Sequence, residues 1–212
     1  MQGKDVGEWV SSVCASRSAS DVEAVYDQWA TSYERDLSNA GIQLPGLAAA
    51  LFCRHTPTGS TPIFEAGVGT GMVGELLYAL GYPEIVGIDV STGMLAQARE
   101  KNVYASLRRM RLGEPLDYPD EMFEGAIAVG VFTPGHAPPV GLSELIRITK
   151  TGSPVLFSVR VNDGEGDDFL DYASKLEEAK RWQCVERTHP ITTLPFADSR
   201  IKNIVLAYQK LG

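Results

Sequence analysis

Residues 63–74 read Ile63-Phe64-Glu65-Ala66-Gly67-Val68-Gly69-Thr70-Gly71-Met72-Val73-Gly74. A short apolar run meets an acid, and glycines then follow at every second position. This order predicts a strand, a tight turn and the beginning of a helix, because glycine lets a turn adopt a positive φ and lets backbone approach a ligand closely. The first turn of a helix adds free N–H groups and the positive end of the helix dipole. We therefore expect a ligand to bind at this turn.

A second apolar run, Ile85 to Ile88, ends in Asp89. Asp89 follows Gly69 by about twenty residues, the distance at which a carboxylate accepts the hydroxyls of a ribose in nucleotide-binding folds. The two runs together predict a site for a cofactor that contains a nucleoside.

Two kinds of cofactor are open at this point. The run from Gly69 to Gly74 matches the dinucleotide pattern G-x-G-x-x-G, which indicates a nicotinamide cofactor. Glu65 favours another cofactor, because a carboxylate at the end of the strand would repel a pyrophosphate but can face an ammonium. S-adenosylmethionine (SAM) carries an amino acid and no phosphate, so the order acid-x-Gly-x-Gly-x-Gly suits SAM. The alternative is that Glu65 is an incidental carboxylate at a strand end.

Length, charge and cysteine usage limit the class of protein. With 212 residues, we expect one domain over 1–212. The net charge of −8 argues against a nucleic-acid partner, which would favour a basic face. No apolar stretch reaches membrane length, and the N-terminus lacks the basic start and apolar core of a signal peptide. From the apolar stretches we expect no membrane partner. The three cysteines, Cys14, Cys53 and Cys184, are far apart and lack metal-ligand spacing, so we expect no metal site and a reducing, cytoplasmic location.

Strand and helix patterns alternate through most of the chain, which predicts an α/β fold with a parallel sheet and helices on both faces. Residues 5–40 and 47–53 are predicted to be helical, with Ser20 and Glu23 as a capping box. Ser91 is expected to cap a later helix, and the last two strands are expected to form an antiparallel hairpin at a sheet edge. The expected strands are 62–66, 84–89, 105–110, 124–130, 153–160, 182–188 and 201–209, and the later helices are 71–80, 92–101, 141–149 and 167–180.

Along nearly its whole length the chain resembles the class I SAM-dependent methyltransferases. The resemblance is carried by Glu65 to Gly71 as their first motif and by Gly87 to Ser91 as their second. Gly130 to Phe132 and Leu142 to Gly152 match two further segments. The stretch Tyr26-Asp27-Gln28-Trp29-Ala30 is similar to the start of the methyltransferases named after the Williams–Beuren syndrome critical region.

The resemblance implies a Rossmann-like sheet of seven mostly parallel strands with an antiparallel C-terminal strand. It implies one methyltransferase domain, with a helical lid at 1–45 and a core at 46–212, and SAM as the cofactor with S-adenosylhomocysteine as its product. In the family, the acid of the first motif faces the ammonium, the acid of the second takes the ribose diol, and the residues that follow flank the adenine. The cofactor-binding residues that the resemblance implies are Tyr26, Tyr33, Glu65, Ala66, Gly67, Gly69, Asp89, Val90, Met94, Leu112, Gly113 and Val129.

Two residues are candidates for catalysis. Methyl transfer from a sulfonium needs an acceptor held in line, exclusion of water and, for an oxygen or nitrogen acceptor, removal of a proton. His136 follows the strand whose end should face the methyl group, so it is the candidate base; the alternative is a histidine that only shapes its loop. Tyr33 lies over the cofactor by analogy, with Tyr26 and Trp29, and is expected to bond the SAM carboxylate or line the pocket; the alternative for these aromatic side chains is ordinary core packing.

The sequence therefore predicts a SAM-dependent methyltransferase (EC 2.1.1 class) that acts on an oxygen, nitrogen or carbon atom of a small molecule, as a monomer or homodimer. A SAM-binding scaffold without transferase activity would carry the same cofactor motif. An NAD(P)-dependent oxidoreductase is a further alternative, but the Tyr-x-x-x-Lys pair of many such enzymes is missing, since Tyr172 is followed by Lys175.

Overall fold

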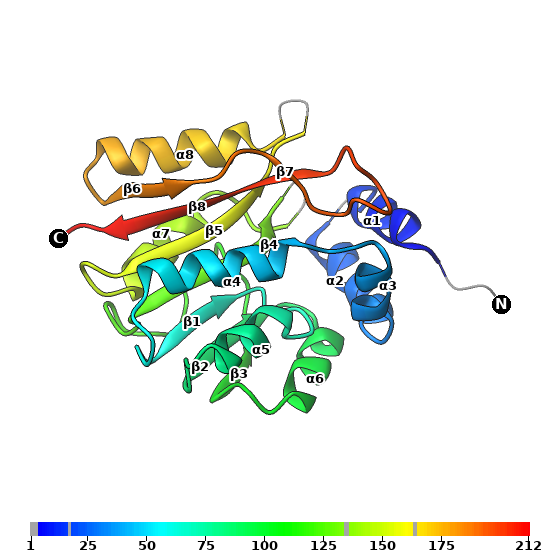
Figure 1. The fold of residues 1–212 in the computed structure, drawn as a ribbon, viewed down its shortest axis with the longest axis horizontal. Coiled ribbons are helices and arrows are strands. Elements are labelled where there is room, and N and C mark those ends of the chain that lie inside the picture. Colours follow the sequence, from blue (N-terminus) through cyan, green and yellow to red (C-terminus); the bar gives the residue numbers. More distant parts are fainter. Residues whose placement is uncertain (1–3, 17, 134–135, 163–164) are drawn as a thin grey trace.

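The computed structural model describes residues 4–16, 18–133, 136–162 and 165–212. In this part of the chain, eight strands form one sheet at the centre of the molecule (Figure 1). They are β1 (Ile63–Ala66), β2 (Ile85–Asp89), β3 (Ser106–Arg109), β4 (Gly125–Phe132), β5 (Pro154–Arg160), β6 (Trp182–Arg187), β7 (Ile191–Thr192) and β8 (Lys202–Lys210).

The order of strands across the sheet is β3-β2-β1-β4-β5-β8-β6, and β7 pairs with β8 beside this path. Strands β1 to β5 run parallel, whereas β8 is antiparallel to β5, β6 and β7. The predicted α/β class and the late antiparallel strands are confirmed. The sheet has eight strands where seven were expected. The additional strand, β7, has two residues, which is too short for an alternating pattern to show in the sequence.

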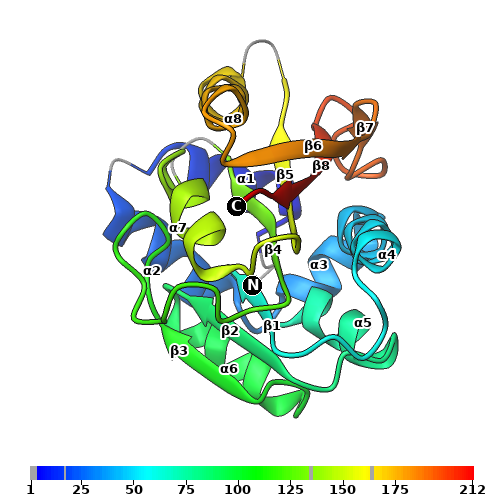
Figure 2. The ribbon, with the colours of Figure 1, turned by 90° about the vertical axis from the view of Figure 1, so that its left-hand side faces the viewer.

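Helices cover both faces of the sheet (Figures 1 and 2). On one face, α7 and α8 pack on the strands through a buried cluster that includes Leu145, Phe157 and Trp182. On the other face, α4 and α5 pack through a cluster that includes Phe52 and Leu77. The helices are α1 (Val6–Cys14), α2 (Ala19–Trp29), α3 (Tyr33–Asn39), α4 (Leu44–His55), α5 (Met72–Ala79), α6 (Thr92–Glu100), α7 (Gly141–Ile148) and α8 (Asp167–Glu178).

The first three helices share a small core of their own, built on Trp9 and Trp29, whose rings stack with centroids 5.5 Å apart. The predicted capping box of α2 is wrong by two residues. Ser18 is the cap, because its extended backbone lets its Oγ accept from the N–H of Asp21, while the Asp21 side chain returns to the Ser18 amide. The helix predicted to run to residue 40 is broken between α2 and α3. Ser91 caps α6 as predicted, accepting from the N–H of Met94 at 3.0 Å.

The sheet positions the site through the ends of its parallel strands. All four residues of β1 are buried, which explains why its residues other than Glu65 are apolar and do not alternate with polar ones. The boundary expected at residue 45 falls in the first turn of α4, and the division into lid and core stays a prediction. Of the helices that the structure describes, none is long and apolar enough to span a membrane.

Candidate functional site

The turn after β1 is built from glycines in the left-handed region. The φ angle is 68° at Gly67, 54° at Gly69 and 91° at Gly71, which begins α5. A Cβ on Gly67 would lie 2.3 Å from the side chain of Val131, whereas a Cβ on Gly69 would have no atom within 4 Å. Packing therefore requires Gly67, and the backbone at Gly69 borders open space where a ligand can lie against it.

Asp89, at the end of β2, is fixed by two backbone amides. Its Oδ2 accepts from the N–H of Gly69 at 2.8 Å, and its Oδ1 accepts from the N–H of Ser91 at 2.9 Å. Burial raises the pKa of this carboxyl, the amides of Ser91 and Gly69 act against that rise, and Asp27 adds to it. Since each carboxylate oxygen has two lone pairs, Asp89 can still accept from a pair of adjacent hydroxyls.

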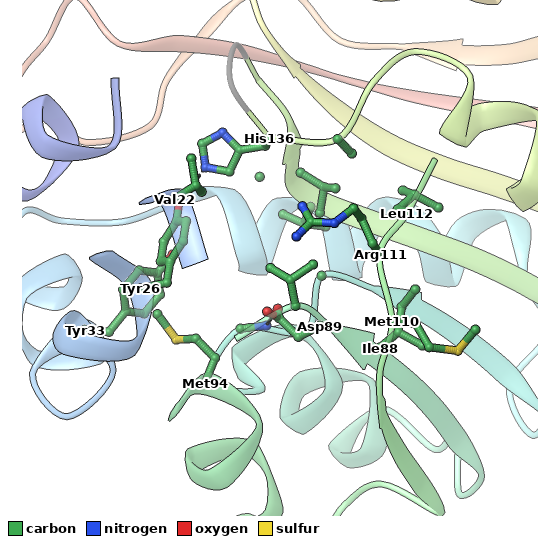
Figure 3. Close-up of a pocket in the computed structure, with 17 residues that line it drawn as sticks. Val22, Tyr26, Tyr33, Ile88, Asp89, Met94, Met110, Arg111, Leu112 and His136 are labelled. Atoms are coloured by element: carbon green, nitrogen blue, oxygen red, sulfur yellow. Dashed lines mark hydrogen bonds between the residues drawn. The ribbon is translucent and has the colours of Figure 1, made fainter. Parts of the chain in front are cut away.

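Two cavities have the glycine turn in their linings. The first has a volume of about 130 Å³ and is drawn in Figure 3; the second has a volume of about 180 Å³. Gly67 and Gly69 line both cavities, whereas Asp89 lines the first and Glu65 lines the second. A ligand that crosses the turn therefore meets one carboxylate on each side.

The buried polar groups of the second cavity suit an amino acid. Glu65 is 2% exposed, and its Oε2 accepts from the hydroxyl of Tyr104 at 2.9 Å. Burial raises the pKa of Glu65 to about 8, the bond from Tyr104 opposes that rise, and Asp89 adds to it. Thr70 is also 2% exposed and lines this cavity, and its Oγ1 has no hydrogen-bond partner in the described part of the chain. A ligand with an ammonium and a carboxylate would supply partners for both residues.

Aromatic side chains from α2 and α3 form one wall of both cavities. The rings of Tyr26 and Trp29 stack with centroids 6.2 Å apart, and Tyr33 meets Trp29 edge-on at 4.6 Å. Burial raises the pKa of Tyr33 to about 12, and the carboxylates of Asp89 and Glu34 add to the rise. The Tyr33 hydroxyl therefore stays protonated and can donate a hydrogen bond, but it is not a base at neutral pH.

His136 joins this wall to the loop after β4. Its Nε2 shares a hydrogen bond of 2.7 Å with the hydroxyl of Tyr26, and its Nδ1 shares one of 2.6 Å with Oγ1 of Thr133. His136 lines both cavities, and Figure 3 shows its ring among the residues that line the first. The intervening residues 134–135 of the loop lie outside the described residues. The structure thus brings both catalytic candidates to the glycine turn, and their roles stay predictions.

Two acidic residues of α2 hold this helix, and with it the aromatic wall, against the rest of the protein. Oδ1 of Asp27 accepts from the Oγ of Ser91 at 2.5 Å and from the N–H of Gly93 at 2.9 Å, so α2 is docked on the N-terminus of α6. Glu23 pairs with Arg109 of β3. In the Tyr-Asp-x-Trp motif, the tyrosine and the tryptophan therefore form part of the cavity wall, whereas the aspartate binds the N-terminus of α6.

Most predicted cofactor residues lie around the first cavity. Ala66 and Gly113 line neither cavity: Ala66 is buried in β1, and a Cβ on Gly113 would lie 2.5 Å from Pro138. The predicted residues that line the first cavity are Tyr26, Tyr33, Gly67, Gly69, Asp89, Val90, Met94, Leu112 and Val129.

The sequence missed several cavity residues. Thr70 stands between two glycines of the turn, so its position could have indicated it. Arg111 lines the first cavity from the segment that follows β3, and Asn203 lines the second from β8. Only the folded sheet brings these two segments to the site, so no local pattern marks them. From the sequence, Arg160, at the end of the strand expected at 153–160, is a possible contact for an acidic substrate; it lines the second cavity from β5 and forms an ion pair with Glu165 at 2.8 Å.

Comparison with known proteins gives matches in both sequence and structure. A family model described as a methyltransferase domain matches residues 63–152. The human methyltransferase-like protein 27 is 32% identical over 168 residues, which cover 74% of this chain and 66% of that protein. The chain thus spans about two thirds of that relative's length.

Solved structures share the fold at low sequence identity. The (4+2)-cyclase SpnF has a TM-score of 0.71 at 16% identity, with 93% of this chain and 98% of that chain covered. A TehB-like SAM-dependent methyltransferase from Corynebacterium glutamicum has a TM-score of 0.65 at 19% identity, with 88% and 98% covered. These identities establish a likeness of fold alone.

Proposed function

The chain belongs to the class I SAM-dependent methyltransferases, and on this premise we propose that it transfers a methyl group from SAM to a small, largely apolar acceptor. One observation carries the proposal: two cavities share Gly67 and Gly69 in their linings, and Asp89 lines one of them while Glu65 lines the other. SAM carries a ribose diol for Asp89 and an ammonium for Glu65 on one molecule, and it has no phosphate that an ionised Glu65 would repel.

The residues present suit SAM at each part of the molecule. Asp89 would hold the ribose hydroxyls, and Val90 and Met94 would flank the adenine in the first cavity. In the second cavity, Glu65 would face the ammonium, and the Thr70 hydroxyl, which has no partner among the described residues, would donate to the carboxylate.

The chemical task of the protein is mainly positioning. SAM supplies a methyl group that is already activated by its positively charged sulfur. The protein has to hold an acceptor atom in line at about 3–3.5 Å and to keep water out. Tyr26 and Tyr33 line both cavities and Trp29 lines the second, and Trp29 is packed from behind by the stacked ring of Trp9.

An oxygen or nitrogen acceptor also has to lose a proton, and His136 is the proposed recipient. Its Nε2 is bonded to the hydroxyl of Tyr26, so the proton reaches it in one of two ways. The acceptor replaces Tyr26 at Nε2, or the hydroxyl of Tyr26 relays the proton. The bond of Nδ1 to Thr133 holds the ring in place in both cases.

The lining of the second cavity favours a neutral, apolar acceptor. Among its described lining residues, the side chains that can carry a charge are Glu65, Arg160 and His136. Arg160 forms an ion pair with Glu165 at 2.8 Å, and Glu65 is assigned to the ammonium of SAM. A polyanionic acceptor would find no surplus positive charge there. The apolar lining residues are Val10, Val13, Trp29, Leu37, Ile42, Leu44, Pro45, Val68, Met72, Val73, Val129, Leu194 and Ile201.

The test is transfer of an isotopically labelled methyl group to matched acceptors. Hydrophobic alcohols, phenols and amines are offered beside their phosphate esters, and beside RNA and protein, with Gly69→Val protein as the background. We expect label in a neutral small molecule together with S-adenosylhomocysteine. Label that enters only RNA, protein or the phosphate esters would contradict the proposal.

We further infer a cytoplasmic location and a monomeric or homodimeric state. The location is supported by the thiols of Cys53 and Cys184, which are free, while the side chain of Cys14 lies outside the described part of the chain. The grouping with the Williams–Beuren methyltransferases stays a prediction.

A further inference from the structure

Tyr104 reaches the carboxylate of Glu65 from outside the cavities. It lies between α6 and β3, where the N–H of the next residue, Ala105, donates to the carbonyl of Ile85 in β2 at 2.8 Å. Its hydroxyl donates to Oε2 of Glu65 at 2.9 Å, yet Tyr104 is not among the residues that line the two cavities. The phenol therefore acts on the carboxylate from the protein side.

Three glycines make room for the Tyr104 ring. A Cβ on Gly74 would lie 2.2 Å from its hydroxyl oxygen, and Cβ atoms on Gly71 and Gly87 would lie 3.1 Å and 3.2 Å from its ring carbons. Gly71 also needs its positive φ, and other side chains crowd Gly87 more closely. At Gly74 the three nearest atoms all belong to Tyr104. Glycine is less favourable than alanine inside a helix. The space that the Tyr104 ring occupies is therefore the physical reason for a glycine at position 74.

This contact accounts for the third glycine of the turn motif. Gly69, Gly71 and Gly74 together match the dinucleotide pattern, in which the third glycine serves close packing of helix and strand. Here the space at Gly74 holds a phenol that bonds a carboxylate. The same three glycines thus serve a site with an acid in it, which a pyrophosphate would avoid.

We propose that Tyr104 is a positioning residue that makes the site select cofactors with an ammonium group. Its bond to Oε2 fixes the Glu65 carboxylate so that Oε1 accepts from the ammonium in the second cavity. The proposal rests on the proposed function, because it takes SAM as the ligand that Glu65 faces.

The surroundings of Glu65 explain why one phenol matters. Glu65 is buried, and the Tyr104 hydroxyl is the group whose bond lowers its pKa against the effect of burial. Without that hydroxyl the carboxyl ionises at higher pH, and it loses its fixed orientation. The other titratable groups nearby are Asp89 across the turn, Tyr33, His136 and Arg160 in the cavity wall, and Lys101 beside Gly71, which is paired with Glu34 and Glu75.

The experiment compares Tyr104→Phe with the wild type by calorimetry, using SAM and 5′-methylthioadenosine, which keeps the nucleoside and lacks the amino acid. Phenylalanine keeps the ring over the glycines and removes the hydroxyl alone. We expect SAM affinity to fall about tenfold or more and 5′-methylthioadenosine affinity to stay unchanged. We also expect the rise of SAM affinity with pH, measured from about pH 6 to pH 8, to move to higher pH.

Two further variants separate positioning from folding. Tyr82→Phe is the matched control, because the buried Tyr82 donates to the carbonyl of Thr56 at 2.6 Å and neither residue lines the two cavities. This variant should leave both affinities unchanged. Gly74→Ala should reproduce the loss for SAM, because its Cβ displaces the Tyr104 hydroxyl while alanine favours the helix.

The outcomes separate the proposed role of Glu65 from the proposed role of Tyr104. A wild type that binds SAM no better than 5′-methylthioadenosine removes the proposed role of Glu65, and the role of Tyr104 with it. A wild type that prefers SAM, with the preference and its pH profile unchanged in Tyr104→Phe, overturns the role of Tyr104 alone. An equal loss for both ligands in Tyr104→Phe also overturns it, since that would mark a structural role.

Discussion

Replacing Asp89 with alanine tests the nucleoside side of the site. In the structure both carboxylate oxygens are anchored, one by the N–H of Gly69 and one by the N–H of Ser91, so the group is held ready for a diol. A hydrogen bond to a charged group contributes about 1.5–3 kcal/mol. Its loss corresponds to a decrease in SAM affinity of about 10- to 150-fold. The Gly69 amide also loses its acceptor, which loosens the turn and adds to the effect.

Calorimetry with two ligands makes the Asp89 test specific. SAM and 5′-methylthioadenosine share the ribose, so Asp89→Ala should weaken both by a similar factor, in contrast to Tyr104→Phe. The matched control is Asp168→Ala, which removes an exposed acid in the first turn of α8. Circular dichroism checks that the fold is retained. An unchanged affinity in a folded Asp89→Ala protein, or a loss confined to SAM, would refute the reasoning.

Four further predictions follow from the same geometry. Gly69→Val should abolish SAM binding with little change in far-ultraviolet circular dichroism, since its side chain would enter open space over the turn; retained binding would limit the glycine to the turn itself. His136→Ala should lower kcat by about 10²–10⁴-fold with SAM affinity nearly constant, and near-normal kcat would leave His136 as a loop-shaping residue. The pKa of Glu65 is raised from 4.5 to about 8, so protonated Glu65 should stabilise the ligand-free protein below about pH 4.5, and this stabilisation should be lost as the pH rises towards 8. SAM binding near pH 7 should therefore release a proton, which calorimetry in buffers of different ionisation enthalpy would measure. Binding without proton release would contradict this. Hydrogen exchange at 20–40 should slow when S-adenosylhomocysteine binds, and equal protection in both states would make these helices a static wall.

The turn and its two acids were predictable from sequence because they are local. Glycines at alternate positions encode a turn, and the distance from Gly69 to Asp89 follows from one strand, one helix and one strand. The same locality predicted the cap at Ser91. It failed at Ser18 and Ser20, where two serines of the same chemistry stand two residues apart and only the backbone conformation distinguishes them.

The contacts that complete the site were not predictable, because they join distant segments. Tyr26 and His136 are separated by 110 positions in the sequence, and Glu65 and Tyr104 by 39. No periodicity records such a pair. The sequence did carry a trace of the second one, since Gly74 is costly in a helix, but the partner that needs the space is known only once the sheet is folded.

The central claim is that one SAM molecule crosses the glycine turn, and a crystal structure of the protein with S-adenosylhomocysteine measures this most directly. We expect adenosine in the first cavity with its ribose on Asp89, the ammonium on Glu65 beside Tyr104, and the sulfur facing the apolar wall of the second cavity. A ligand whose amino acid lies away from Glu65, or whose ribose lies away from Asp89, would contradict it.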